Sequence, residues 1–185
     1  MRTITDGSWG RLDIVFEQMK LTGDRVVLRS PEPPDADVLF AILRQPEIER
    51  RWGRFDIDAV QRDLVEDGAV FVIEADDQIV GAIQYGEEND QMYRHASIDL
   101  FVTTARWGTS IGSDAIRTLT RYLFEDRGHH RLTIDPALDN DRAIRVYERL
   151  GFRAVGVLHQ YERGLDGTFH DGLLMELLRD DLAKD

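Results

Sequence analysis

Hydrophobic residues follow two different periods along the chain, and these periods predict strands alternating with helices. Short apolar runs rich in β-branched residues predict about seven strands, over residues 25–29, 69–74, 79–85, 96–102, 131–134, 155–161 and 173–178. Apolar residues three, four and seven positions apart predict helices that begin near Asp35, Ile57, Gly112 and Asn140. We expect Asp35 to cap the first helix. Without repeats or linkers, this order predicts one α/β (α+β) domain, with a mixed central β-sheet flanked by helices.

One predicted strand, 96–102, is apolar on both faces apart from a single charged residue. Such a run is typical of a strand in the middle of a sheet. Its one charge is Asp99, and a carboxylate at that place is costly unless it is solvated or paired. We therefore treat Asp99 as a candidate functional residue. The structural alternative is an aspartate at a strand edge or one paired with a neighbouring arginine.

The composition narrows the possible chemistry. The 185 residues contain no cysteine, which excludes disulfides, thiolate catalysis and cysteine-bound zinc. The five histidines are too scattered for a metal-binding pattern, so we expect no metal. The net charge of −12 argues against nucleic acid as a partner. It would favour a polycationic substrate, although acidity for solubility alone explains it equally well.

The first twenty residues show little periodicity. They lack the apolar core of a secretory signal, and no run in the chain approaches the roughly 18 apolar residues of a membrane span. We therefore expect an N-terminal extension over 1–20, a domain over 21–185, no membrane partner and a cytoplasmic protein.

A glycine-containing turn follows the predicted central strand and opens the next helix. Gly108 and Gly112 flank Thr109, Ser110 and Ile111. Small residues let a backbone approach an anion closely, and the following helix adds its unpaired N–H groups and its positive dipole end. The turn is thus a candidate pyrophosphate site. Two glycines four residues apart are weak evidence alone, because an ordinary strand–helix turn looks the same.

A second motif begins about two dozen residues after the glycine-containing turn. On a helix, Asn140, Ala143 and Tyr147 share one face, and the small Ala143 leaves room for a ligand beside it. The structural alternatives are a helix cap at Asn140 and an ordinary core tyrosine at Tyr147.

Together the two motifs resemble the signatures of the GNAT superfamily of acyl-CoA-dependent N-acyltransferases. The family's turn, a strand Val followed by Arg/Gln-Gly-x-Gly-x-Gly/Ala, matches Val102 and 107–112, with Trp107 replacing Arg or Gln and Ser110 replacing the central glycine. The second signature matches Asn140, Ala143, Tyr147, Gly151 and Phe152.

This resemblance covers residues 21–182 and implies the GNAT fold, with the sheet splayed at the coenzyme site. It implies acetyl-CoA as co-substrate and hints at a homodimer. The residues it assigns to the coenzyme are Phe101, Val102, Trp107, Gly108, Thr109, Ser110, Ile111, Gly112, Ser113, Asn140, Ala143 and Tyr147.

The resemblance also implies direct acetyl transfer to an amine within a ternary complex. A backbone N–H near Phe101 and Val102 would polarise the thioester carbonyl, and a base would deprotonate the amine. Tyr147 matches the family's proton donor to the leaving thiolate. Because tyrosine titrates near 10 and a thiol near 8.5, full proton transfer is uphill by roughly 2 kcal/mol, which favours a hydrogen bond or late transfer.

The acceptor side looks like that of aminoglycoside 6′-N-acetyltransferases. In those enzymes the residue matching Asp99 holds the acceptor amine and is a proposed base, and Asp135 and Trp52 also match. Asp171 is a further candidate for this pocket, or an ordinary polar residue of an edge strand. We therefore predict Asp99 and Tyr147 as catalytic residues, and a cationic amine as substrate, bound by Trp52, Asp99, Asp135 and Asp171.

Other acceptors remain open at this point. Ribosomal-protein N-terminal acetyltransferases share Trp107-Gly108, the run 122–125 and Asp166-Gly167 with Asp171. A polyamine or an amino sugar outside the antibiotics is a third acceptor class. A non-catalytic acyl-CoA-binding module is the alternative of another kind, but such a module needs neither Tyr147 nor Asp99.

Overall fold

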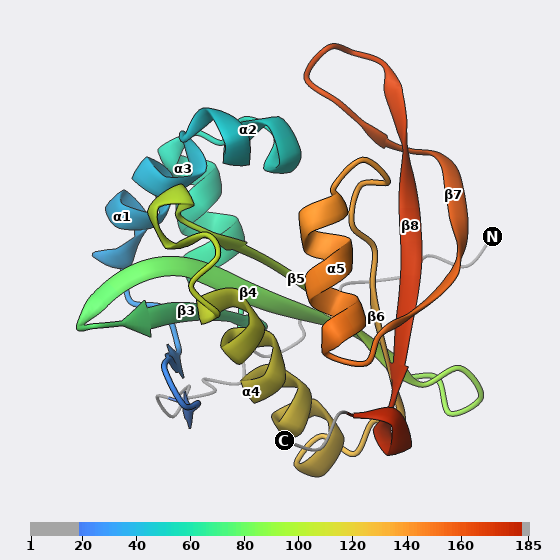
Figure 1. The fold of residues 1–185 in the computed structure, drawn as a ribbon. Coiled ribbons are helices and arrows are strands. Elements are labelled where there is room, and N and C mark those ends of the chain that lie inside the picture. The colour runs from blue at the N-terminus through green and yellow to red at the C-terminus, as the bar shows by residue number, and fades with distance from the viewer. Residues whose placement is uncertain (1–18, 183–185) are drawn as a thin grey trace, which may run out of the picture.

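The computed structural model describes residues 19–182, so most of the predicted extension over 1–20 lies outside the described residues. A single eight-stranded sheet has the order β1-β2-β3-β4-β5-β6-β8-β7 (Figure 1). Its strands are β1 Lys20–Thr22, β2 Val27–Arg29, β3 Val70–Ala75, β4 Gln78–Glu88, β5 His95–Val102, β6 Arg131–Ile134, β7 Arg153–Arg163 and β8 Phe169–Leu178.

The prediction of a mixed sheet is confirmed, since β5 and β6 pair in parallel while the other neighbours are antiparallel. The expected number of about seven strands is one too few. The additional strand is β1, whose three residues are too short to show a period. It forms because its residues pair with β2 from Lys20↔Arg29 to Thr22↔Val27.

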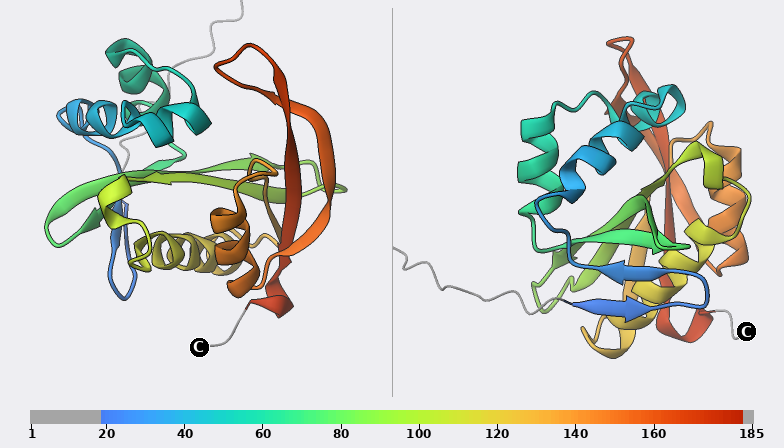
Figure 2. Two further views of the ribbon diagram at one scale, coloured as in Figure 1. Left: turned by 45° about the horizontal axis from the view of Figure 1, so that its top comes forward. Right: turned by 90° about the vertical axis from the view of Figure 1, so that its left-hand side faces the viewer.

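Helices cover both faces of the sheet (Figure 2). One face carries α1 Asp35–Leu43, α2 Pro46–Trp52 and α3 Ile57–Val60, with a π-helical turn at Gln61–Val65 continuing the last of these. The other face carries α4 Ile111–Glu125 and α5 Asp141–Arg149. Short 3-10 turns occupy Thr104–Arg106 and Arg179–Asp181. Each face has its own apolar cluster, and β5 contributes buried residues to both, as the apolar run 96–102 predicts.

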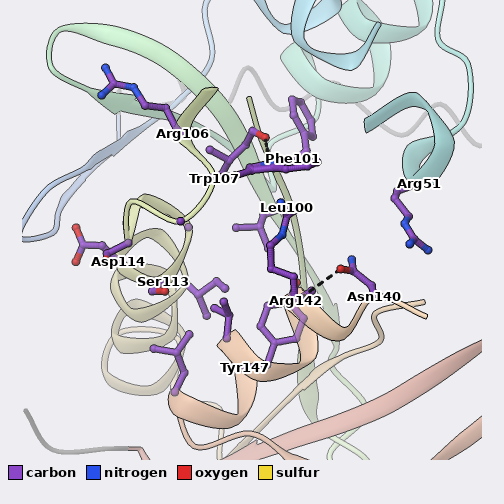
Figure 3. Close-up of a pocket in the computed structure, with 18 of the residues that line it drawn as sticks. Arg51, Leu100, Phe101, Arg106, Trp107, Ser113, Asp114, Asn140, Arg142 and Tyr147 are labelled. Carbon is purple, nitrogen blue, oxygen red and sulfur yellow. Dashed lines mark hydrogen bonds between the residues drawn. The ribbon is translucent and has the colours of Figure 1, made fainter. Parts of the chain in front are cut away.

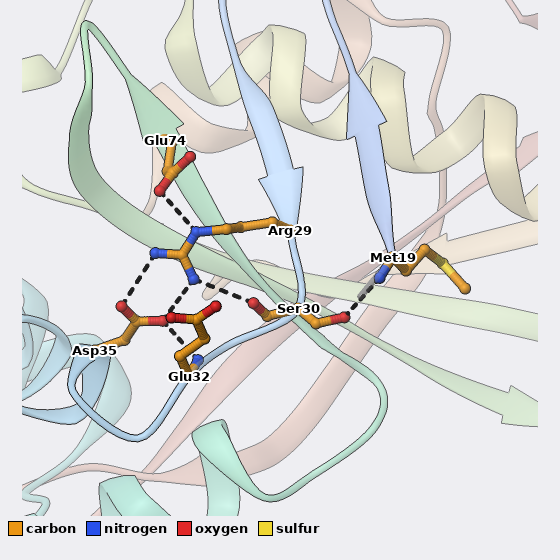
Figure 4. Close-up of polar contacts among 6 residues, drawn as sticks. All are labelled: Met19, Arg29, Ser30, Glu32, Asp35 and Glu74. Atoms are coloured by element: carbon orange, nitrogen blue, oxygen red, sulfur yellow. Dashed lines mark hydrogen bonds and ion pairs between the residues drawn. The ribbon is translucent and has the colours of Figure 1, made fainter. Parts of the chain in front are cut away.

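Contrary to our expectation, Asp35 is not the cap of the first helix. It takes part in an ion pair that joins this helix to the sheet. Pro34 is the N-cap residue and no side chain caps the helix. The Asp35 carboxylate instead accepts from Arg29 at 2.6 Å and from the backbone N–H of Glu32 at 2.7 Å (Figure 4). Arg29 also donates to Glu74 at 2.7 Å, so it connects β2, β3 and α1.

The sheet opens beside its central strand. β5 pairs with β6 only at Ala96↔Leu132 and Ser97↔Thr133. Beyond Ile134 the chain stays with β8, since Pro136 O accepts from the N–H of Leu173 at 2.9 Å. The C-terminal half of β5 therefore has no strand beside it on the β6 side, which confirms the expected splay.

Candidate active site

A cavity of about 890 Å³ lies where the sheet opens, between β5, the first turns of α4, and α5 (Figure 3). The two motifs found in the sequence meet here. The residues assigned by resemblance that line it are Phe101, Val102, Trp107, Gly108, Ser110, Gly112, Ser113, Asn140, Ala143 and Tyr147. Thr109 and Ile111 do not line it: the Thr109 hydroxyl donates to Arg106 O at 2.6 Å, and the Ile111 side chain is buried in the core.

The turn before α4 has an unusual backbone. Gly108 has φ +79°, and Ser110, the N-cap residue of α4, has φ +67°, in the left-handed region. The family signature has glycine at the position of Ser110, and this φ explains why, because glycine adopts it without steric cost. The first N–H groups of α4, which have no partner within the helix, follow directly.

Gly112 faces β5 across the space between α4 and the strand. A Cβ at Gly112 would lie 3.8 Å from Val102 Cγ2 and 3.9 Å from Leu100 Cδ1, so a side chain there would extend into the gap between the helix and the strand. Since Gly112 lines the cavity, its lack of a side chain preserves space for a ligand that runs along β5.

The backbone of β5 directs one donor toward the opening. The N–H of Thr103 donates to Val80 O, at 2.7 Å, on the β4 side. Because N–H directions alternate along a strand, the N–H of Val102 points to the side where β6 has diverged. The carbonyl of Val102 points the same way and accepts from Trp107 Nε1 at 2.8 Å (Figure 3).

Arg142 crosses from α5 to the turn that precedes α4. Its guanidinium carbon lies 3.3 Å from the centre of the Trp107 ring, a cation–π contact. Sequence reasoning did not single out Arg142, because the contact joins segments far apart in the chain. Nothing in the local pattern around Asn140 distinguishes it from the other arginines of α5.

The second motif contains a helix cap, Asn140, and a buried tyrosine, Tyr147. Asn140 caps α5, its Oδ1 accepting from the N–H of Ala143 at 3.3 Å, so the cap is confirmed (Figure 3). Tyr147 is buried in the core and also lines the cavity. Burial, and secondarily the charges of Asp99 and Asp135, raise the pKa of Tyr147 well above its usual range. Its hydroxyl therefore keeps its proton at neutral pH.

Asp99 faces a second, smaller cavity of about 350 Å³, on the α1–α3 side of the sheet. Asp135, Ser97 and Gln84 line the same cavity. No arginine in the described part of the chain forms an ion pair with Asp99, whose Oδ1 accepts from the N–H of Leu100 at 2.8 Å. The arginine-paired alternative is therefore not what is found.

The Asp99 side chain is exposed, and it lies in the wall of this cavity. Removal from bulk water is the main reason that its pKa rises to about 7, while the N–H of Leu100 opposes the rise. The negative charges of Asp135 and Glu162 add to the increase. A carboxylate with this pKa can bind and release a proton near neutral pH.

Two residues of β7 join this side of the site and were missed in the sequence. Tyr161 donates a hydrogen bond to Asp135, which raises the pKa of Tyr161 to about 12. Partial desolvation raises the pKa of Glu162. A register shift between Leu158 and Glu162 interrupts the pairing of β7 with β8. Strict alternation along the predicted strand 155–161 therefore could not show which side chains face inward.

The two remaining predicted acceptor residues lie in different places. Trp52, at the end of α2, lines the larger cavity and packs edge-on against Phe101, with ring centres 4.9 Å apart. Phe101 shares its strand face with Asp99, so Trp52 stands on the Asp99 side. Asp171 lines neither cavity and instead accepts from the His159 side chain at 3.0 Å and the N–H of Gln160 at 2.8 Å.

The described residues contain neither a metal-binding cluster nor a membrane-spanning helix. No group of three or more His, Asp or Glu side chains is arranged to hold a metal ion between residues 19 and 182. Over the same residues, no helix has the length and apolar character needed to cross a membrane.

Comparison with known proteins agrees with this geometry. The model of the acetyltransferase (GNAT) domain family matches residues 25–153. The uncharacterized N-acetyltransferase YoaA of Bacillus subtilis is 25% identical over 154 residues, covering 76% of this chain and 86% of that protein. Aminoglycoside N(6′)-acetyltransferase type 1 of Klebsiella pneumoniae is 26% identical over 159 residues, covering 74% and 78%.

A solved structure gives the same fold. RimJ of Mycobacterium smegmatis, in complex with a CoA disulfide, superposes with a TM-score of 0.77 at 24% identity and covers 91% of both chains. The family match extends over most of the chain and includes both motifs that line the larger cavity. The chain therefore belongs to the GNAT acetyltransferases and is an acetyl-CoA-dependent N-acetyltransferase.

Proposed function

We propose that this enzyme acetylates a primary amine of a cationic small molecule, and that the acceptor is an aminoglycoside-type antibiotic. One observation carries the proposal: the Asp99 carboxylate has no arginine partner among the described residues and a pKa of about 7. It lies on the same central strand that forms one wall of the larger cavity. An amine bound at Asp99 would reach that cavity from the α1–α3 side.

The acidity around Asp99 favours an acceptor with more than one positive charge. Asp135 lines the same cavity, and Glu162 is close enough for its charge to affect Asp99. Several carboxylates facing one space repel one another, and a ligand with several ammonium groups relieves that repulsion. Aminoglycosides are such polyamines. The Klebsiella relative that acts on an aminoglycoside supports this acceptor class.

The larger cavity suits the coenzyme. We assign its diphosphate to the first N–H groups of α4, beside Gly108 and Ser110, where helix polarity favours an anion. The gap at Gly112 leaves room along β5 for the arm that carries the thioester. When bound, the coenzyme supplies an acetyl group on sulfur, and the N–H of Val102 is oriented to stabilise a negative charge on the acetyl oxygen.

The proton movements use two side chains. The ammonium of the acceptor loses a proton to the Asp99 carboxylate, and its nitrogen then attacks the acetyl carbon. As the carbon–sulfur bond breaks, the sulfur leaves as a thiolate that accepts a hydrogen bond from the Tyr147 hydroxyl. The attacking nitrogen loses its second proton to solvent, which leaves a neutral amide, and Asp99 releases the first proton before the next turnover. Because the pKa of Tyr147 lies above its usual range, hydrogen bonding fits better than early proton transfer.

A thiol-release assay with acetyl-CoA and a panel of acceptors tests the proposal. The panel contains kanamycin-like and kasugamycin-like aminoglycosides, spermidine, and peptides with free N-termini. We expect the highest kcat/KM with an aminoglycoside, and we expect Asp99→Asn to abolish its acetylation at saturating acceptor. Thiol release with peptides alone, or with spermidine alone, would refute the aminoglycoside assignment.

A further inference from the structure

Arg25 lies in the turn between β1 and β2, yet its side chain reaches the turn that opens α4. Its Nη1 donates to the carbonyl of Thr109 at 2.5 Å. It also lines the larger cavity, together with Ser110 and Ser113 of the α4 end. Neither sequence motif includes Arg25, and its separation from Thr109 along the chain hides the contact.

The backbone around Arg25 is held firmly on α4. The Asp114 carboxylate, in the first turn of α4 and only 4% exposed, accepts from the N–H groups of Arg25 at 2.7 Å, Val26 at 3.0 Å and Asp24 at 3.3 Å. The approach is so close that a Cβ at Gly23 would collide with Asp114 and Thr118. The base of the Arg25 side chain is therefore fixed relative to the helix.

The charge of Arg25 has no carboxylate partner in the described part of the chain. Two other arginines that line the cavity form ion pairs, Arg51 with Asp139 and Arg106 with Asp76. Within residues 19–182, the hydrogen bond that the Arg25 guanidinium donates goes to a neutral carbonyl. A guanidinium has five N–H donors, and here one is used, so several remain available to an anion. Asp24 lines the same end of the cavity, and its carboxylate is the nearest opposing charge along the chain.

We propose that Arg25 binds a phosphate group of coenzyme A and so acts as a coenzyme-binding residue contributed by the β1–β2 turn. The inference rests on the use of acetyl-CoA by this enzyme and not on the identity of the acceptor. The guanidinium presents a planar set of donors that matches phosphate geometry. The competing interpretation is that Arg25 only fastens the β1–β2 turn to Thr109.

Calorimetric titration of the full-length enzyme with three ligands tests the proposal: coenzyme A, 3′-dephospho-coenzyme A and pantetheine. Coenzyme A carries the diphosphate and the 3′-phosphate. 3′-Dephospho-coenzyme A carries the diphosphate only, and pantetheine carries no phosphate. We expect Arg25→Gln to weaken coenzyme A binding by roughly tenfold to a hundredfold, the effect of losing a hydrogen bond to a charged group, while pantetheine binding stays unchanged.

The result with 3′-dephospho-coenzyme A shows which phosphate Arg25 contacts. Weaker binding of both phosphate-bearing ligands places Arg25 on the diphosphate, and weaker binding of coenzyme A alone places it on the 3′-phosphate. An equal loss for all three ligands means that Arg25 only fastens the turn and overturns the proposal, as does unchanged binding of all three. Folding should survive the substitution, because the three bonds to Asp114 come from backbone N–H groups.

Two control variants separate local from general charge effects. Arg121→Gln makes the same charge change on α4, outside the lining of the cavity, and should leave coenzyme A binding unchanged. Asp24→Asn removes the carboxylate beside Arg25 and should leave coenzyme A binding equal or tighter. Because no acceptor is present in the titration, a failed aminoglycoside assignment would not alter its outcome.

Discussion

The guanidinium of Arg142 stacks on the indole of Trp107, with 3.3 Å from the guanidinium carbon to the ring centre. This contact joins the first turn of α5 to the turn before α4, across the larger cavity. Trp107 is in turn fixed to β5 by its bond to the carbonyl of Val102. The stack therefore connects α5 to β5 through Trp107.

Loss of this stack should weaken the fold slightly. Arg142→Ala should lower the free energy of unfolding by about 0.5–1 kcal/mol, the value of an exposed cation–π contact. Urea denaturation followed by circular dichroism measures the change. Arg145→Ala, on the same helix and exposed, is the matched control and should change stability less. Equal losses in the two variants would mean that the stack adds nothing beyond helix propensity.

The pH dependence of catalysis should report Asp99. Since its pKa is about 7 and the base must be unprotonated, kcat/KM should fall as the pH is lowered through 7. A pH–rate profile of the wild-type enzyme between pH 5 and 9 should show this inflection. A profile that stays flat through pH 7 would remove Asp99 from the role of base.

The same raised pKa has a consequence for stability. Below pH 7 the folded protein holds a proton on Asp99 that the unfolded chain, with an ordinary carboxyl, has released above about pH 4. The folded state thus binds more protons in this window, so the Asp99 contribution to stability declines as the pH rises from 4 to 7. Asp99→Asn should therefore stabilise the protein more at pH 8 than at pH 4, as thermal unfolding at both values can measure.

The Tyr147→Phe variant distinguishes an effect on turnover from an effect on coenzyme A affinity. It removes only a hydroxyl, so turnover should fall well over tenfold through loss of the hydrogen bond to the leaving sulfur, while coenzyme A affinity is nearly kept. Steady-state kinetics and calorimetry measure the two quantities. The control is Tyr161→Phe, which should raise the KM of the acceptor, because Tyr161 contacts Asp135. Wild-type turnover in Tyr147→Phe would exclude the donor role.

Ser110→Gly should relieve backbone strain. The left-handed conformation of Ser110 costs a residue with a side chain about 1–2 kcal/mol. Glycine avoids this cost, but it loses more conformational entropy on folding, which offsets about 0.5–1 kcal/mol of the gain. We expect a net stabilisation of up to about 1 kcal/mol, seen as a rise in Tm of about 2–4 °C. Gly108→Ser, which forces a side chain into φ +79°, should shift Tm in the opposite direction. A lower Tm for Ser110→Gly would contradict the strain argument.

The sequence predicted the long elements well, because a long helix or strand contains several repeats of its hydrophobic pattern. The strand 96–102 and the helix that begins near Gly112 carry clear periods, and both are present. β1 has three residues and shows no period, so only its pairing with β2 defines it. Asp35 looks like a helix cap in the sequence, but the approach of Arg29 from another strand gives its carboxylate a different partner.

Contacts between distant segments account for what the sequence could not show at the site. Asp99 and Tyr147 stood out because a charge in an apolar strand and a tyrosine in a spaced motif are local signals. Arg25 and Arg142 gave no such signal, since their partners Thr109 and Trp107 lie elsewhere in the chain.

By its place in the sheet β5 is an interior strand, but over its last residues it behaves as an edge. Edge strands present unpaired N–H and C=O groups, and proteins usually shield them because another chain can pair there. Here the edge lies inside the molecule, where it forms a wall of the larger cavity between α4 and α5. In the proposed complex, the backbone groups that an ordinary sheet offers to its next strand face the coenzyme instead.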